Sequence, residues 1–184
     1  MFDHDQLPSE HALRYLKAHL RNVPDFPKPG ILFKDITPLL GDPHEFALAL
    51  DGMEARWRPD GVDAVAAIEA RGFILGGALA DRLNASFVPL RKPGKLPYES
   101  RRVEYSLEYG TDAIEVHVDA FQPGARVLVV DDVLATGGTA AAACKRVRET
   151  GAVLWGVGFL VELAFLHGRE KLPTTQIHSL LTYA

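Results

Sequence analysis

Apolar residues follow two different periods along the chain, and the alternation of these periods predicts strands followed by helices. Leu16, Leu20 and Val23 recur at helical spacing, which predicts an amphipathic helix over about 9–21 with Ser9 as its cap. Short, almost continuous apolar runs favour strands buried on both faces of a sheet. Such runs cover residues 62–68, 86–90, 127–130 and 153–161, and helices are predicted at 43–57, at 72–83 and from 140 onward. This order predicts an α/β domain with a mostly parallel central sheet flanked by helices.

Two segments interrupt this order with polar residues, proline and glycine. Residues 24–30 contain three prolines and cannot form a central strand. Residues 92–110 are mostly polar, and within them Val103, Tyr105 and Leu107 alternate with polar side chains. A loop of this length without elements of its own is uncommon unless it is functional. We therefore expect an antiparallel excursion that can fold over a site.

Residues 127–139 carry the densest chemistry, because a predicted strand leads there into an acidic pair, a glycine turn and a helix. Asp131 and Asp132 follow the apolar run. The turn consists of Ala135, Thr136, Gly137, Gly138 and Thr139. Open α/β sheets bind ligands at the carboxyl ends of their strands, and the free N–H groups of a helix start suit a phosphate. Ionised aspartates accept hydrogen bonds from hydroxyls, so the pattern describes a ribose 5-phosphate site. The alternative is that both aspartates only cap the helix.

Cationic residues follow the two predicted strands at 62–68 and 86–90. Arg71 comes after the first, and Arg91, Lys92 and Lys95 come after the second. Since parallel strands end at one edge of a sheet, these side chains are predicted to face the same crevice as the aspartates and to neutralise a diphosphate. A surface salt bridge for Arg71 and a solvated basic turn for the others are the alternatives.

Composition narrows the classes of protein that fit. The 184 residues suit one domain, and a formal net charge of −4 gives no sign of a nucleic-acid-binding surface. The one cysteine, Cys144, excludes an intramolecular disulfide and is expected to be buried in the helix after the glycine turn. The first residues are acidic and no apolar run approaches transmembrane length, so a cytoplasmic protein that contacts no membrane is expected.

The 127–139 stretch resembles the motif with which type I phosphoribosyltransferases bind phosphoribosyl diphosphate (PRPP). Its sequence is most similar to that of the adenine-specific members of this family. The resemblance extends over about 26–183 and includes Tyr-Ser-Leu-Glu-Tyr-Gly at 105–110 and Gly-Arg-Glu-Lys-Leu at 168–172. It implies a type I phosphoribosyltransferase fold with a single domain over 1–184.

In this fold a small hood and a flexible loop lie over the carboxyl ends of the strands. The resemblance implies that the N-terminal residues to about 40 and the 92–110 excursion form the hood. It further implies that Asp131 and Asp132 bind the ribose hydroxyls of PRPP and that residues 135–139 bind its 5′-phosphate.

The resemblance also implies roles for residues at the base and the diphosphate. In adenine-specific members a phenylalanine stacks on the purine and the backbone of its two neighbours bonds the base edge, which assigns adenine binding to Leu32, Phe33 and Lys34. Lys34 stands where several relatives have arginine, a mild change if only its backbone reads the base. Arg71 is implied to contact the pyrophosphate as a catalytic residue. The peptide bond before it, Ala70–Arg71, is implied to be non-proline cis.

Glu108 is implied to donate a proton to N7 of the purine during catalysis. The alternative, a loop carboxylate that pairs with Arg101 or Arg102, stays open. None of the seven histidines lies in the matched motifs, so they offer no better acid.

The implied reaction is adenine plus PRPP giving AMP and pyrophosphate, a step of purine salvage. Mg²⁺ is the implied cofactor, carried on diphosphate and water rather than by assigned protein ligands. The implied assembly is a homodimer, with no nucleic acid as partner. Two alternatives remain: a phosphoribosyltransferase for a 6-oxopurine or orotate, and a PRPP-sensing regulator that binds nucleic acid without catalysis. The acidic charge and the short N-terminal segment argue against the regulator.

Overall fold

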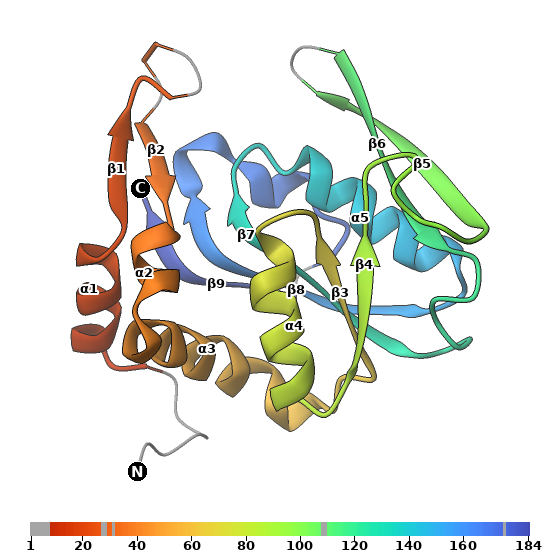
Figure 1. The fold of residues 1–184 in the computed structure, drawn as a ribbon, viewed down its shortest axis with the longest axis horizontal. Coiled ribbons are helices and arrows are strands. Elements are labelled where there is room, and N and C mark those ends of the chain that lie inside the picture. The colour runs from red at the N-terminus through yellow and green to blue at the C-terminus, as the bar shows by residue number, and fades with distance from the viewer. Residues whose placement is uncertain (1–7, 27–28, 31, 108–109, 175) are drawn as a thin grey trace.

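A five-stranded parallel sheet forms the centre of an α/β domain (Figure 1). The computed structural model describes residues 8–26, 29–30, 32–107, 110–174 and 176–184. The strand order is β4–β3–β7–β8–β9, and every neighbouring pair is parallel. The strands are β3 (Ala64–Ile68), β4 (Ser86–Leu90), β7 (Arg126–Leu134), β8 (Val153–Leu163) and β9 (Ile177–Tyr183). The predicted parallel α/β architecture is confirmed.

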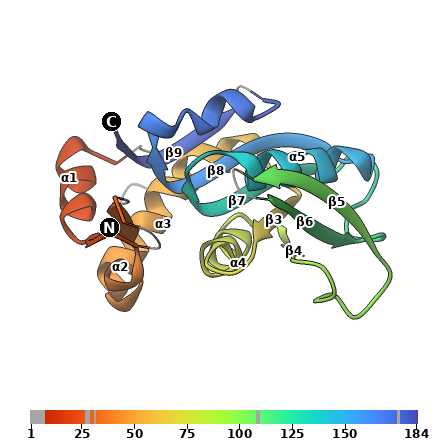
Figure 2. The same cartoon turned by 90° about the horizontal axis from the view of Figure 1, so that it is seen from above.

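Helices cover both faces of this sheet because its strands are apolar on both faces. In β7, Leu128 and Val130 pack in one core cluster, whereas Val127 and Val129 pack in the other. The first face carries α1 (Glu10–Ala18), α2 (Thr37–Gly41), α3 (Pro43–Trp57) and α4 (Gly72–Arg82), and the second carries α5 (Gly138–Glu149) (Figure 2). Cys144, a residue of α5, is fully buried, as predicted, and its burial raises the pKa of the thiol to about 12.

The direction of the chain across the sheet reverses between β3 and β7. After β3 the chain enters α4 on one face and continues to the edge strand β4, whereas after β7 it enters α5 on the other face and continues to β8. The loops that leave β3 and β7 therefore diverge. In open α/β sheets, ligands bind at such a point, outside the carboxyl ends of the strands.

Two antiparallel hairpins extend beyond this edge of the sheet. β1 (Arg21–Pro24) pairs with β2 (Leu32–Asp35), and β5 (Ser100–Leu107) pairs with β6 (Gly110–His117). Figure 1 shows both hairpins rising on the side on which β3, β4 and β7 end. The second hairpin packs against α5. The predicted antiparallel excursion is confirmed, and its return strand runs from Gly110 to His117.

Short 3₁₀ helices complete the elements of the described residues. They cover Arg58–Asp60, Ala164–Leu166 and Gly168–Lys171, and the last two connect β8 to β9. In the part of the chain that the structure describes, no helix is long and apolar enough to cross a membrane.

The N-terminal helix is shorter than the predicted 9–21. Ser9 caps it as predicted, since its hydroxyl accepts a backbone N–H of the first turn at 3.2 Å. The helix ends at Ala18, and Arg21 begins β1. Val23, whose spacing fits the helical period, pairs instead with Phe33 in the first hairpin. A period of three or four residues over so short a segment does not distinguish a continued helix from a following strand.

Candidate active site

Asp131 and Asp132 lie where β7 has lost one of its two neighbours. Pairing with β3 ends at Val130, while pairing with β8 continues to Leu134. The sequence placed both aspartates after the strand, but the continued pairing keeps them inside it. The Asp131 carboxylate accepts the backbone N–H of Asp132 at 2.9 Å, and only 5% of Asp132 is exposed. The acidic pair is thus fixed by the sheet rather than by a loop.

The aspartates do not occupy the capping position of α5, because Gly137 is its N-cap. Gly137 has φ = 78° and ψ = −3°, in the left-handed region that favours glycine. The first turn of α5 has backbone N–H groups that no earlier turn of helix can accept, and the helix dipole makes this end positive. The turn that follows the acidic pair can therefore bind an anion such as a phosphate.

Close packing also requires the glycine at this turn. A Cβ on Gly137 would lie closer than 3.0 Å to the carbonyl oxygen of Gly168, and a Cβ on Gly168 would lie equally close to the carbonyl oxygen of Ala135. Two backbone segments that are 31 positions apart in the sequence therefore touch without space for a methyl group. The backbone of the 3₁₀ segment thus supports the turn from behind.

The surroundings of Asp131 oppose the ionisation of its carboxyl group. Removal of its carboxyl group from water and the charge of the neighbouring Asp132 raise the pKa of Asp131 well above its ordinary value, and Arg71 opposes that rise. A ligand that brings hydroxyl donors or positive charge to this group favours its ionised form.

Arg71 connects the end of β3 to the acidic pair on β7. It is the N-cap residue of α4, and its Nε donates to the carboxylate of Asp132. Gly72 allows the close approach, since a Cβ there would lie 2.9 Å from an oxygen of Asp131. The Arg71 side chain stays 47% exposed, so this ion pair is neither wholly buried nor a simple surface pair. The predicted convergence of Arg71 with the aspartates is observed.

The prediction about the peptide bond at this turn is wrong by one position. The cis bond joins Glu69 to Ala70 rather than Ala70 to Arg71. Arg71 already has the helical angles φ = −68° and ψ = −29°. The chain therefore changes direction directly after β3 ends at Ile68, one residue earlier than expected.

The base-binding segment predicted around Phe33 lies on β2, beside Arg71. The Cζ atom of Arg71 is 5.4 Å from the centre of the Phe33 ring, a cation–π distance. Phe26 meets Phe33 edge to face, with ring centres 5.1 Å apart. Leu32 is 47% exposed. An aromatic face, on a strand that pairs only with β1 among the described residues, thus stands one side chain away from the acidic pair.

Lys34 directs its side chain away from this group. Its Nζ donates to Oδ1 of Asn22 at 2.6 Å and lies 4.2 Å from the centre of the Tyr183 ring. The ammonium is therefore engaged within the hairpin and at the end of β9. The predicted reading of a base by the backbone of Lys34 stays a prediction.

Asp35 ends β2 and fixes the start of α2. Its carboxylate accepts the hydroxyl of Thr37 at 2.5 Å and the backbone N–H of Thr37 at 2.9 Å. These two hydrogen bonds lower the pKa of Asp35, and the charges of Arg21 and Arg71 add to the effect. The hairpin is thus anchored to the domain by an ionised carboxylate.

Arg91 is placed at the same edge but is committed to protein partners. Its Nε donates to Glu69 at 2.8 Å and its Nη1 donates to the carbonyl oxygen of Lys95 at 3.0 Å. It therefore ties the connection after β4 to the turn that carries Arg71. Lys92 and Lys95 are exposed in that connection. Their predicted contact with a diphosphate stays a prediction.

Sequence reasoning missed three residues of this site. Glu69 holds Arg91, Phe26 packs on Phe33, and Gly168 supports the glycine turn. The Phe-Pro spacing before Gly30 was a local signal for Phe26, whereas the other two contacts join distant segments. Glu108, the predicted proton donor, lies outside the described residues.

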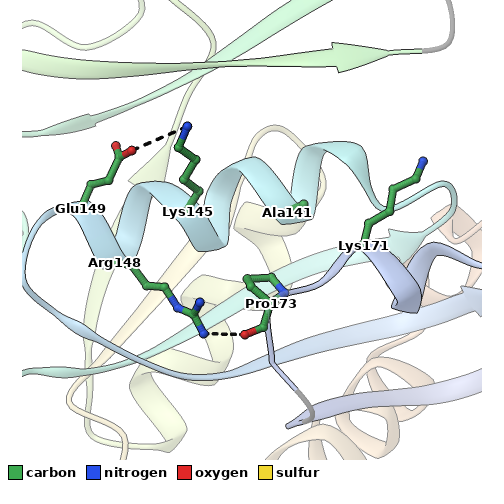
Figure 3. A pocket seen from close by; sticks show the side chains of 6 residues that line it. All are labelled: Ala141, Lys145, Arg148, Glu149, Lys171 and Pro173. Carbon is green, nitrogen blue, oxygen red and sulfur yellow. Dashed lines mark hydrogen bonds and ion pairs between the residues drawn. The ribbon is translucent and has the colours of Figure 1, made fainter.

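A hollow lies between α5 and the segment that connects β8 to β9. It is lined by Ala141, Lys145, Arg148, Glu149, Lys171 and Pro173 (Figure 3). Arg148 donates to the carbonyl oxygen of Pro173 at 2.5 Å, and Lys145 lies 3.9 Å from Glu149. Ala141, Lys145, Arg148 and Glu149 belong to α5, whereas Lys171 and Pro173 belong to the connection between β8 and β9.

The strand order and the arrangement at its reversal define a phosphoribosyltransferase-type domain, and the family model described as phosphoribosyl transferase domain matches residues 45–173. A protein of Sorangium cellulosum named adenine phosphoribosyltransferase is 64% identical over 172 residues, which cover 94% of this chain and 86% of that protein. One from Anaeromyxobacter dehalogenans with the same name is 55% identical, with 91% of this chain and 98% of that protein covered. The chain therefore belongs to the adenine phosphoribosyltransferase family.

Solved structures agree with this assignment. The crystal structure of adenine phosphoribosyltransferase from Rhodothermus marinus superposes with a TM-score of 0.91 at 50% identity and covers 95% of this chain and 100% of that one. The Saccharomyces cerevisiae enzyme, complexed with an imino-altritol bisphosphate and adenine, superposes with a TM-score of 0.89 at 38% identity and covers 94% and 100%. The type I phosphoribosyltransferase fold implied by the sequence is confirmed.

Proposed function

We propose that this protein transfers the 5-phosphoribosyl group of PRPP to adenine, giving AMP and pyrophosphate for purine salvage. The observation that carries the proposal is the single side chain of Arg71, which contacts Phe33 on one side and Asp132 on the other. A base stacked on Phe33 and a sugar held by the aspartates would then lie next to each other. The yeast relative, whose structure contains adenine and a bisphosphate, supports this reading.

The sugar phosphate is proposed to bind at both of its ends. The turn at 135–139 takes the 5′-phosphate through backbone N–H groups and the hydroxyls of Thr136 and Thr139. Asp131 and Asp132 accept hydrogen bonds from the ribose hydroxyls. Binding energy from the phosphate, which does not react, then orients C1 of the ribose for attack by N9 of adenine.

Arg71 is the proposed partner of the leaving diphosphate, together with Arg91, Lys92 and Lys95. Negative charge grows on the diphosphate as it departs, and cations placed beforehand stabilise it most where it develops. The structure gives Arg91 a further role, because its bonds to Glu69 and the Lys95 carbonyl fix the loop that carries both lysines. Positive charge on the sugar is favoured by the adjacent aspartates.

Mg²⁺ is the proposed cofactor, and the donors present fit an ion carried by the substrate. Among the described residues, no three histidine, cysteine, aspartate or glutamate side chains converge as metal ligands. Mg²⁺ commonly keeps several waters and binds substrate phosphates, so an ion carried by the diphosphate needs no dedicated set of protein ligands. When bound, the ion neutralises charge on the diphosphate.

Leu32, Phe33 and Lys34 are the proposed adenine-binding residues, with Glu108 as the acid for N7. The engaged ammonium of Lys34 supports edge recognition by backbone groups alone. The two hairpins, one before residue 40 and one within the 92–110 excursion and its return strand, form the proposed hood. Its closure excludes water that would hydrolyse PRPP.

The proposal includes a cytoplasmic homodimer. Ile74 on α4 and Phe87 on the edge strand β4 are 46% and 41% exposed, and Phe73 meets Phe87 edge to face at 5.8 Å. Exposed aromatic and aliphatic side chains on the outermost strand of the sheet favour a second copy of the chain as partner. Sedimentation analysis is expected to give twice the chain mass, and Phe87→Glu is expected to give the single-chain mass.

The deciding experiment for the activity is incubation with adenine, PRPP and Mg²⁺, followed by measurement of AMP and pyrophosphate. Hypoxanthine, guanine and orotate serve as competing bases. Preferred use of adenine supports the proposal. Preferred use of another base would indicate a phosphoribosyltransferase that is specific for that base. Absence of turnover with every base, combined with DNA binding, would favour a PRPP-sensing regulator instead.

A further inference from the structure

Glu162 and Arg169 form a two-pronged ion pair behind the glycine turn. Glu162 lies near the end of β8 and is 4% exposed. The Nε and Nη2 atoms of Arg169 donate to its two carboxylate oxygens, each at 2.7 Å. Burial opposes the charge of Glu162, but the hydrogen bonds from Arg169 and Ser179 outweigh burial and lower its pKa. The pair is therefore ionised and geometrically fixed.

Arg169 also binds the neighbouring strand. Its Nη1 donates to the carbonyl oxygen of Ile177 at 3.1 Å, and its Nη2 lies 3.4 Å from the hydroxyl of Ser179. Both partners are on β9, whereas Glu162 is on β8. One guanidinium thus fixes the 3₁₀ segment Gly168–Lys171 to two adjacent strands of the sheet.

The residue before Arg169 is Gly168, which touches the glycine turn. A Cβ on Gly168 would come closer than 3.0 Å to the carbonyl oxygen of Ala135 and within 3.1 Å of the backbone nitrogen of Gly137. Both are backbone atoms, so a side chain there could be accommodated only if the turn itself moved. The position of Gly168 therefore determines the position of the turn.

We propose that Glu162 and Arg169 are positioning residues for the sugar phosphate, which act by holding Gly168 against the turn at 135–137. This inference rests on the proposed function, because it takes the turn as the binding site of the 5′-phosphate of PRPP. Neither side chain contacts substrate. Their effect is transmitted by backbone contact: with Gly168 fixed, Gly137 keeps its left-handed conformation and the first N–H groups of α5 stay aimed at the phosphate.

The test substitutes Gly168→Ala and compares it with Gly41→Ala, whose Cβ would meet nothing within 4 Å. Initial rates are measured with PRPP and adenine varied separately, and the rise in Tm on adding PRPP alone is recorded. Because small displacements of a binding group can cost about 10²-fold in rate, we expect Gly168→Ala to raise KM for PRPP at least about tenfold. KM for adenine should stay within about twofold, and Gly41→Ala should match the wild type.

Arg169→Lys and Arg169→Met provide a graded second test that does not add atoms at the turn. Lysine keeps the positive charge of arginine but not its planar set of N–H donors. Arg169→Lys should therefore retain part of the PRPP affinity that Arg169→Met loses. If Gly168→Ala fails to fold, the KM ratio of these two variants decides the inference. Equal KM for PRPP in wild type and all variants that fold would overturn it, as would equal rises for PRPP and adenine. No response of the wild type to PRPP would overturn the proposed function itself.

Discussion

The two sides of the proposed active site are built in different ways. On the sugar-phosphate side, the aspartates lie inside a central strand, and the glycine turn rests on the backbone of another segment. On the base side, Phe33 lies on a hairpin with strands of four residues each, outside the main sheet. Phe26 and Leu32, which belong to the base side, are 51% and 47% exposed.

This difference indicates that the sugar site is preformed, whereas the base site needs its ligand to be completed. A side chain on a strand of a sheet that is packed on both faces has few alternative positions. A short two-stranded sheet has little stability of its own. Substitutions on the first side should therefore affect PRPP use, and substitutions on the second should affect adenine use. Kinetics of substituted proteins, with each substrate varied in turn, can show whether the two sides are separable.

The largest effect is expected for Asp131→Asn combined with Asp132→Asn. Loss of two charged acceptors for the ribose hydroxyls should lower kcat/KM for PRPP about 10³-fold, since a hydrogen bond to a charged group contributes roughly 1.5–3 kcal/mol. Steady-state kinetics with PRPP as the varied substrate measures the loss.

Asp63→Asn is the matched control for the double variant. Asp63 also pairs with an arginine, Arg126, at 3.1 Å, but Asp63 directly precedes β3 and Arg126 begins β7, so this pair lies at the amino ends of the strands. Its kcat/KM for PRPP should equal that of the wild type. Near-normal PRPP use by the double aspartate variant would remove the ribose assignment.

The next largest effect is expected for Glu108→Gln. General acid catalysis commonly contributes 10²–10⁴-fold, so kcat should fall about 10²-fold while the affinity for PRPP changes little. Single-turnover rates together with PRPP titration separate the two quantities. An unchanged kcat would leave Glu108 as the partner of Arg101 or Arg102.

Phe33→Ala should change the use of adenine alone. Stacking of a base on an aromatic ring contributes about 1–3 kcal/mol, so KM for adenine should rise about tenfold or more, with KM for PRPP within about twofold. Lys34→Arg is the neighbouring control, expected to change either constant by less than about threefold, because the Lys34 ammonium is engaged with Asn22 and Tyr183. A parallel rise of both KM values in Phe33→Ala would mean that the two sides are not separable.

The sequence predicted those parts of the fold and site that depend on neighbouring residues. The strand Ser86–Leu90 has the predicted bounds. The acidic pair and the glycine turn could likewise be predicted from the sequence, because the strand, the turn and the start of the helix follow one another within thirteen residues. Local order of this kind survives in the fold because one strand–turn–helix unit carries it.

Other features required the tertiary structure. β7 continues through Asp131 to Leu134 because β8 still pairs with it after β3 has ended, and no sequence pattern reports the length of a neighbour. The bond between Glu69 and Arg91 and the contact of Gly168 with the turn join segments that only the assembled sheet brings together. The position of the cis peptide was missed because the resemblance suggested it one residue too late.

The smallest predicted effect concerns the stability of the folded protein. It tests whether the preformed sugar site lowers that stability. The pKa of Asp131 in the folded protein is raised well above its ordinary value, by burial and by Asp132. A raised pKa means that the folded state favours the protonated form. The contribution of Asp131 to stability is therefore complete below the ordinary pKa of an aspartate. It is lost as the pH rises through the pKa that Asp131 has in the folded protein. Asparagine does not ionise, so Asp131→Asn should match the wild type near about pH 4 and have a Tm a few degrees higher near about pH 8.

Asp63→Asn should show the opposite dependence on pH. Hydrogen bonds from Arg126 lower the pKa of Asp63, so its contribution to stability is present at neutral pH and is lost as pH falls through the folded pKa. Thermal unfolding of both variants and the wild type, without ligand and across this pH range, measures the two slopes. An Asp131→Asn variant that is less stable than the wild type at the upper end would show that the carboxylate is stabilised before PRPP arrives. The contrast between a preformed and a ligand-completed side would then rest on packing alone, because charge would no longer distinguish them.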